Sequence, residues 1–145
     1  MITITTDYHT KSDTYISKDI YGNQITFKSD REKNIEAIES QGTTIGPMIS
    51  LLMACGACSA IDIVMILDKQ RQNYDTIRVI VKGEREQNQT PALWKNIEVI
   101  YEVSGNVDES KAIKAAELSV EKYCSVLETL RRAGAQIQYQ VKLNA

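Results

Sequence analysis

Three cysteines are the residues of this sequence with the greatest capacity for redox or metal chemistry, and two of them, Cys55 and Cys58, form a CxxC motif. In thioredoxin-type sites the first cysteine of such a motif lies at a helix N-terminus, where its pKa is lowered. Here the helix is expected to begin near Pro47, which places Cys55 two turns inside it. A zinc site built on the CxxC motif needs two further ligands, for which Cys124 and His9 are the candidates. We therefore disfavour both uses of the motif and expect neither a cofactor nor a bound metal.

The composition indicates one globular domain and excludes several function classes. The chain has 145 residues, of which 43% are hydrophobic and 25% charged, with a formal net charge of −2. This charge balance argues against a nucleic-acid partner. A single histidine, His9, argues against catalytic triads that depend on an imidazole. The start of the sequence has no secretory pattern, so we expect a cytoplasmic protein with reduced thiols.

The first 30 residues predict two or three antiparallel strands. Alternating or β-branched runs cover Met1–Asp7, Asp13–Lys18 and Gln24–Lys28, and a Gly-Asn pair at Gly22 marks a hairpin between the last two. The polar stretch Ser29–Thr44 predicts either a short helix or a mobile loop.

A long apolar helix is predicted to follow, beginning at Pro47, since proline is well tolerated at a first helical position. The segment from Met48 to Leu67 is apolar on nearly every side, with Asp62 as its one charged residue. A membrane span is the competing interpretation, but Asp62 is costly there and no basic residue closely precedes the segment. We favour a buried core helix and no membrane association. A chain of this length cannot cover such a helix on all faces, which favours a homodimer.

The C-terminal half predicts two strands, a helix and a final strand. Asp75–Arg85 and Ile97–Val103 alternate in the manner of half-buried strands, Asp108 is a candidate helix N-cap, and Gln136–Leu143 alternates again. One continuous helix is expected from Asp108 to Arg132, with Lys111 and Lys114 facing outward. Its apolar stripe comprises residues 112, 113, 116, 120, 123, 127 and 130. The predicted order is βββ-α-ββ-α-β, an α+β fold without a parallel βαβ sheet.

Helical spacing places the thiols on inward faces. Cys55 and Cys58 are three residues apart and lie toward one side of the first helix. Cys124 lies in the stripe of the second helix and points inward. Two helices on one core can bring Cys58 and Cys124 together, but periodicity alone favours cysteines that pack as small hydrophobic residues.

Two cysteine-containing segments carry a resemblance to a known family. GPMISLLMACGACSAIDIV followed by LDKQRQ resembles the central helix of the OsmC/Ohr family, in particular its OsmC-like subgroup. LSVEKYCSV resembles the second cysteine motif of that family, and IEVIYEVSG the strand before it. The resemblance implies a single OsmC-like domain over residues 1–145 and an intertwined homodimer with its active site at the interface. It also implies a cysteine-based peroxidase for oxidative stress defence, which reduces organic hydroperoxides.

In that family pattern Cys58 is the peroxidatic thiol and Cys124 the resolving thiol, while Cys55 has no mapped role. An external dithiol restores the reduced enzyme. Apolar side chains, with Ile49, Met53 and Ile61 as candidates, are expected to favour an apolar peroxide.

The sequence departs from the family pattern at the groups that activate the reactive cysteine. Ile49 occupies the place of a glutamate that orients an arginine, and Arg31 is the candidate arginine. Asp62 either faces the thiol and raises its pKa or is hydrogen-bonded elsewhere. Lys122 and Arg131 are further candidate cations, each expected to be solvated. These departures leave a second hypothesis: a non-catalytic protein that binds a small apolar ligand or senses redox state on the same dimeric scaffold.

Overall fold

The computed structural model describes residues 1–28 and 44–144, which divide into two compact units, Met1–Ser50 and Leu51–Ala145. The predicted short helix or loop at Ser29–Thr44 lies almost entirely outside the described residues, and so does Arg31. A single domain over the whole chain stays a prediction.

The N-terminal unit holds a four-stranded sheet in the order β1-β2-β3-β4. The predicted antiparallel strands are confirmed as β1 (Thr5–His9), β2 (Thr14–Lys18) and β3 (Gln24–Phe27). Gly22 has a φ of 87° in the turn between β2 and β3, a conformation that glycine adopts without strain. The sequence did not predict β4 (Thr44–Ile45), which pairs parallel to β3.

The C-terminal unit is built on a three-stranded sheet in the order β5-β6-β7. The strands are β5 (Asn73–Arg85), β6 (Trp94–Asn106) and β7 (Gln136–Leu143), with β5 antiparallel and β7 parallel to β6. The α+β class is confirmed, and each predicted strand overlaps an observed strand. The expectation of no parallel βαβ pairing is wrong, because the helices between β6 and β7 form a crossover that returns the chain in the same direction.

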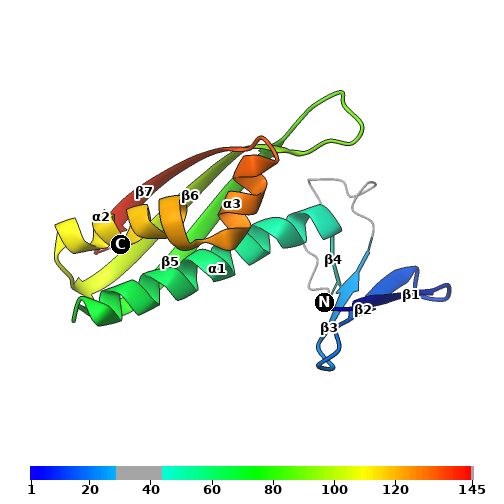
Figure 1. Cartoon of the computed structure of the whole chain (residues 1–145), viewed down its shortest axis with the longest axis horizontal. Coiled ribbons are helices and arrows are strands. Elements are labelled where there is room, and N and C mark those ends of the chain that lie inside the picture. Colours follow the sequence, from blue (N-terminus) through cyan, green and yellow to red (C-terminus); the bar gives the residue numbers. More distant parts are fainter. Residues whose placement is uncertain (29–43, 145) are drawn as a thin grey trace. The chain divides into compact units, whose positions relative to one another are not determined.

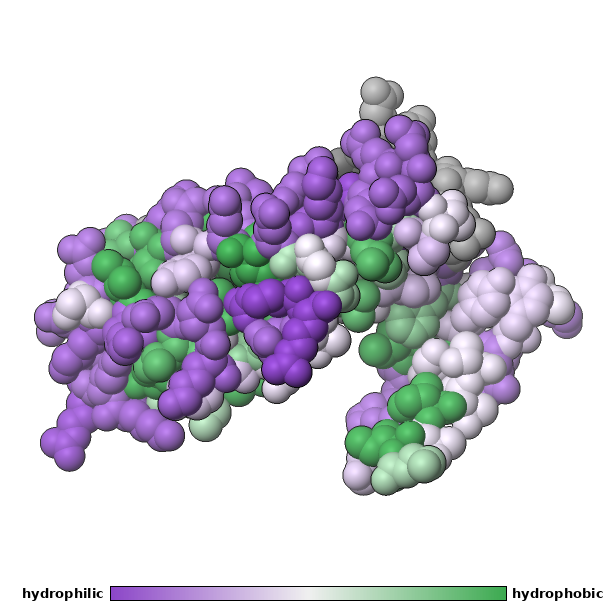
Figure 2. Space-filling model, turned by 45° about the horizontal axis from the view of Figure 1, so that its top comes forward, coloured by the Kyte–Doolittle hydropathy of each residue, from purple (hydrophilic) through white to green (hydrophobic). Residues whose placement is uncertain are grey.

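One face of this sheet forms the core and the other is polar. Ile97, Val99, Tyr101 and Val103 on β6 are at most 2% exposed and face the helices, which all cover the same side of the sheet (Figure 1). The opposite face carries ion pairs between β5 and β6, Arg78 with Glu102 and Lys82 with Glu98. Hydrophilic residues accordingly cover much of the larger unit in Figure 2.

The predicted long helix is confirmed as α1 (Pro47–Lys69), and it has two contrasting apolar faces. Its buried face comprises Cys55, Ser59, Ile63 and Leu67, each four residues from the next. A second series with the same spacing points to solvent and is called here the exposed apolar stripe: Met53, Ala57, Ile61 and Met65. Both faces are therefore apolar, but this chain covers one of them and leaves the other open.

The contact between α1 and the sheet is close at Gly83 on β5. A Cβ atom at this position would lie 2.6 Å from Cδ1 of Leu52 on α1 and 3.0 Å from the ring of Trp94 on β6. A larger residue at position 83 would therefore require the side chain of Leu52 and the indole of Trp94 to shift.

The predicted second helix is interrupted. It consists of α2 (Glu109–Leu118), a π-helical turn η1 (Ser119–Tyr123) and α3 (Ser125–Arg132), with Cys124 in an extended conformation at ψ 99° between the last two. The N-cap is confirmed, since the side chain of Asp108 accepts a hydrogen bond from the backbone N–H of Lys111 at 3.2 Å.

The interruption changes which residues of this segment are buried. Lys111 and Lys114 face outward as expected, and Ala112, Ala116, Val120, Leu127 and Leu130 are buried. Ile113 and Tyr123 were expected in the apolar stripe but are 46% and 50% exposed. Tyr123 belongs to the π-helical turn, where a continuous helical period assigns side chains to the wrong face. Ile113 lies in the regular helix α2, before the interruption, so its exposure has a different origin.

Candidate functional site

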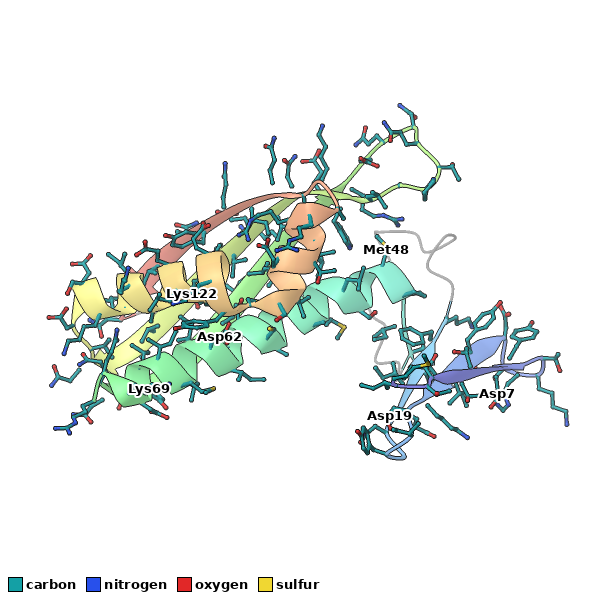
Figure 3. All side chains as sticks on the ribbon, in the orientation of Figure 1. Asp7, Asp19, Met48, Asp62, Lys69 and Lys122 are labelled. Atoms are coloured by element: carbon teal, nitrogen blue, oxygen red, sulfur yellow. The ribbon has the colours of Figure 1, made fainter. Side chains whose placement is uncertain are left out.

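The structure brings Cys58, Asp62 and Cys124 together inside the C-terminal unit. The two sulfur atoms and a carboxylate oxygen all lie within 4.8 Å of one another. Cys58 and Asp62 are one turn apart on α1, and Cys124 comes from the break between η1 and α3. Figure 3 shows Asp62 on the side of α1 that faces this break. The predicted approach of the two helices therefore places Cys58 beside Cys124, and both cysteines are free thiols.

Cys124 is the more enclosed of these two thiols and carries most of the hydrogen bonds. It is 2% exposed, whereas Cys58 is partly exposed. Its Sγ accepts hydrogen bonds from the backbone N–H of Leu127 at 3.5 Å and from the hydroxyl of Ser59 at 3.8 Å. Tyr101 in turn donates to the Ser59 oxygen at 3.2 Å. Burial nevertheless raises the pKa of Cys124 to about 11, with the Leu127 N–H acting in the opposite direction.

Asp62 both faces the thiols and has a hydrogen-bond partner. The hydroxyl of Ser119, a buried residue of η1, donates to Oδ2 of Asp62 at 3.0 Å. Burial raises the pKa of this carboxyl group, and the Ser119 hydrogen bond partly offsets the increase. Asp62 therefore lies near the thiols and is hydrogen-bonded within its own chain, whereas its effect on the acidity of the reactive thiol stays a prediction. Its fixed position depends on Ser119, which helical periodicity did not single out.

Cys55 lies one turn before Ser59 on the buried face of α1 and is fully enclosed. Burial raises its pKa to about 12, so its thiol is protonated near neutral pH. Its environment is that of a small core side chain.

The candidate cations among the described residues are engaged elsewhere. The ammonium of Lys122 lies 5.3 Å from the ring centre of Tyr123. Arg131 pairs with Glu128 and donates to the backbone carbonyl of Val120 at 2.8 Å, so it is held on the protein surface rather than fully solvated. In residues 1–28 and 44–144 no lysine or arginine forms an ion pair or hydrogen bond with either thiol of the site.

A small hollow lies next to Cys124 on the outer side of α3. Its volume is about 280 Å³. Its lining is mixed and mostly polar: Lys122, Tyr123, Cys124, Ser125, Glu128, Thr129 and Arg132. Ile49, Met53 and Ile61 are exposed on α1 in the single chain, at 43%, 56% and 59%, and an apolar lining formed by them stays a prediction.

Most of the chain is similar in sequence to proteins of a known family. A family model described as OsmC-like protein matches residues 40–140. The protein YhfA of Escherichia coli strain K12 is 41% identical over 88 residues, and YhfA of Shigella flexneri matches to the same extent. This alignment covers 60% of the chain and 65% of YhfA, so the chain spans just under two thirds of the length of these relatives.

Solved structures resemble this chain over nearly its full length. A hypothetical protein from Aquifex aeolicus VF5 is 30% identical with a TM-score of 0.76, covering 100% of this chain and 98% of the other. An OsmC-like protein from Mycoplasma pneumoniae has a TM-score of 0.77 at 18% identity over 100% and 98%. An organic hydroperoxide resistance protein from Elizabethkingia anophelis has a TM-score of 0.65 at 12% identity over 99% and 94%. The last two likenesses concern the fold.

The family match also bears on the nature of α1. This helix is long and apolar enough to cross a membrane by length and composition. It lies entirely within the matched residues 40–140, where it is the core helix of a soluble fold and neither a signal nor an anchor. With the order of strands and helices, the matched residues and the solved structures in agreement, the chain belongs to the OsmC-like family.

Proposed function

We propose that this protein is a thiol peroxidase that reduces organic hydroperoxides through Cys58 and Cys124. The observation that carries the proposal is the proximity of two thiols with different exposure, within 4.8 Å of each other. Bond formation requires the two sulfur atoms to approach by less than about 3 Å, since a disulfide is about 2.05 Å long. Side-chain rotation with a small backbone adjustment provides a movement of this size.

The partly exposed thiol is the better candidate for reaction with peroxide. The thiolate of Cys58 attacks the distal oxygen of the hydroperoxide, the O–O bond breaks, and the alcohol leaves after taking up a proton. The Cys58 sulfenic acid then reacts with the thiol of Cys124, which releases water and forms the disulfide. An external dithiol reduces this disulfide by exchange and is itself oxidised.

The surroundings of Cys124 suit a resolving thiol. Its Sγ accepts the Leu127 N–H at the N-terminus of α3, where the helix dipole favours negative charge. This hydrogen bond offsets only part of the effect of burial, which raises the pKa of Cys124 to about 11. An external dithiol reaches the more exposed sulfur of the disulfide, that of Cys58, more readily than the enclosed sulfur of Cys124.

The proposed enzyme is one OsmC-like domain over residues 1–145 that works as an intertwined homodimer in the cytoplasm. Proteins of the OsmC-like family typically form dimers. Support from this chain comes from the exposed apolar stripe, in which Met53, Ile61 and Met65 are 56%, 59% and 53% exposed. Large apolar patches of this kind commonly mark subunit interfaces. In a dimer these side chains become candidates for the apolar lining of the peroxide site.

A second candidate is a protein of the same dimeric scaffold that binds a small apolar ligand or senses redox state without turnover. The specific observation in its favour is electrostatic. Burial raises the pKa of Cys124, and the described residues provide no cation contact to either thiol. A thiolate nucleophile needs such stabilisation to form readily at neutral pH.

Mass spectrometry under non-reducing conditions separates the two candidates. The reduced protein is treated with about one equivalent of an alkyl hydroperoxide and sampled over time. The comparison includes Cys58→Ser, Cys124→Ser and, as a matched control, Cys55→Ser.

A peroxidase forms a Cys58–Cys124 disulfide in the wild type and in Cys55→Ser, and not in the other two variants. Repeated turnover with an added dithiol distinguishes an enzyme from a sensor. Thiols that all stay reduced contradict the peroxidase and leave the ligand-binding candidate.

A further inference from the structure

We propose that Cys58, Asp62 and Cys124 form a binding site for a thiophilic divalent cation of the zinc type. The site goes beyond the proposed peroxidase, although it uses the same two thiols. It differs from a zinc site built on the CxxC motif, because Cys55 is turned into the core and takes no part. The ion is a reversible ligand of the reduced protein, since its binding requires both sulfur atoms as thiols.

The positions of the three donor atoms suit tetrahedral coordination. Zinc binds thiolates at about 2.3 Å and carboxylate oxygens at about 2.0–2.2 Å, so two sulfur ligands of one ion lie about 3.8 Å apart. The donors of Cys58, Asp62 and Cys124 already lie within 4.8 Å of one another. An adjustment of about 1 Å completes a three-ligand site. The fourth position stays open to water or an added ligand.

Hydrogen bonds to the ligands hold them in orientations that favour binding. Ser119 donates to Oδ2 of Asp62, which leaves the second carboxylate oxygen available. Leu127 and Ser59 hold the sulfur of Cys124 from two sides. Outer partners of this kind fix the ligand atoms of metal sites before the ion arrives. The donor set is also chemically suitable, because two thiolates and a carboxylate are typical ligands for zinc.

Charge provides a reason for the site to prefer a cation. Cys58, Asp62 and Cys124 are three acidic groups that share a partly buried space. Among residues 1–28 and 44–144, no basic side chain pairs with any of them. A divalent ion binds the two sulfur atoms as thiolates, releases their protons and compensates most of the negative charge that results. Both sulfur atoms are then committed to the metal, which makes them unavailable for disulfide formation.

The test is metal binding by the full-length protein, reduced with a phosphine and kept free of peroxide. Zinc affinity is measured by competition with a chromophoric chelator. Cobalt(II) serves as a second probe, because thiolate coordination gives a charge-transfer band and tetrahedral geometry gives intense visible bands. The variants are Cys58→Ser, Cys124→Ser and Asp62→Asn, and the last retains an oxygen that accepts the Ser119 hydrogen bond. Asp75→Asn, at an exposed aspartate of β5, is the matched control.

The expected result is one zinc per chain, with thiolate and tetrahedral bands for cobalt in the wild type and in Asp75→Asn. Each ligand variant is expected to weaken binding at least as much as loss of an outer partner, about 10- to 100-fold. Wild-type affinity no higher than that of a Cys58→Ser, Cys124→Ser double variant overturns the site. Unchanged affinity in folded Asp62→Asn overturns the proposed ligand set. Peroxide reactivity is assayed separately on metal-free protein, so a failed peroxidase and a failed metal site give different results.

Discussion

Replacement of Ile61 by aspartate tests whether the exposed apolar stripe is a subunit interface. Full burial of an isoleucine side chain contributes about 1.5–3 kcal/mol. Ile61 is 59% exposed in the single chain, so an interface that covers it gains about 0.9–1.8 kcal/mol from each protomer. A symmetric dimer contains this residue twice, which gives about 2–3.5 kcal/mol in total. The introduced carboxylate adds a desolvation cost to this loss.

The expected outcome is a dimer dissociation constant at least about 25-fold higher for Ile61→Asp, since about 1.4 kcal/mol corresponds to a factor of ten. Sedimentation velocity across a dilution series measures this constant. Ile113→Asp is the matched control, because Ile113 on α2 is 46% exposed and lies outside the stripe. Equal dissociation constants for Ile61→Asp and the wild type would refute the assignment of the stripe to the interface.

Three further predictions concern stability. Leu127→Ala removes a fully buried side chain of α3 and is expected to lower the free energy of unfolding by about 2–5 kcal/mol, measured by urea titration. Thr129→Ala, at an exposed position of the same helix, is the control and is expected to change this free energy by less than about 0.5 kcal/mol. Asp108→Ala removes the cap of α2 and is expected to lower the thermal midpoint through a loss of about 0.5–2 kcal/mol. Burial raises the pKa values of Cys55 and Cys124 from 9.0 to about 12 and about 11. The folded state therefore favours the two protonated thiols, and the stability that they contribute is complete below pH 9. It is lost as the pH rises through the folded-state pKa values of the two thiols. Denaturation of the reduced protein between pH 8 and about 11 tests this, and a flat profile would contradict it.

Elements with strong local signals were predictable from the sequence. The alternation in β5 and β6 gave the correct facing residues, because Ile77, Val79 and Val81 pair with Val103, Tyr101 and Val99 in the observed register. Pro47 and Asp108 marked the starts of two helices. Proline lacks an N–H group that would have no partner at a first helical position, and the aspartate side chain accepts a hydrogen bond from an otherwise unpaired N–H group. In each case the physical cause lies within a few residues of the signal.

The interruption at Cys124 was not predictable by the same means. The segment Ser119–Ser125 contains neither glycine nor proline, and cysteine is not among the common capping residues. The sulfur of Cys124 nevertheless caps α3 by accepting the Leu127 N–H. The parallel pairing of β7 and the short strand β4 depend on tertiary pairing, which local periodicity does not encode.

The candidate site was predictable in part. The predicted approach of Cys58 and Cys124 is confirmed, although Cys124 lies in the break between η1 and α3 rather than in a helix, and the roles of the two cysteines stay predictions. The contribution of Ser119 depends on the π-helical turn that directs its hydroxyl to Asp62. A helical pattern read from sequence contains no sign of such a turn.

The single tryptophan of this chain makes the C-terminal unit suitable for label-free optical measurements. Trp94 is 8% exposed, and its ring lies at Gly83, where Leu52 of α1 also approaches. Its emission therefore reports whether α1 stays docked on the sheet. A shift of this emission to longer wavelength on peroxide or metal addition would reveal a loosening of the helix, and a constant spectrum would locate the response at the thiols alone.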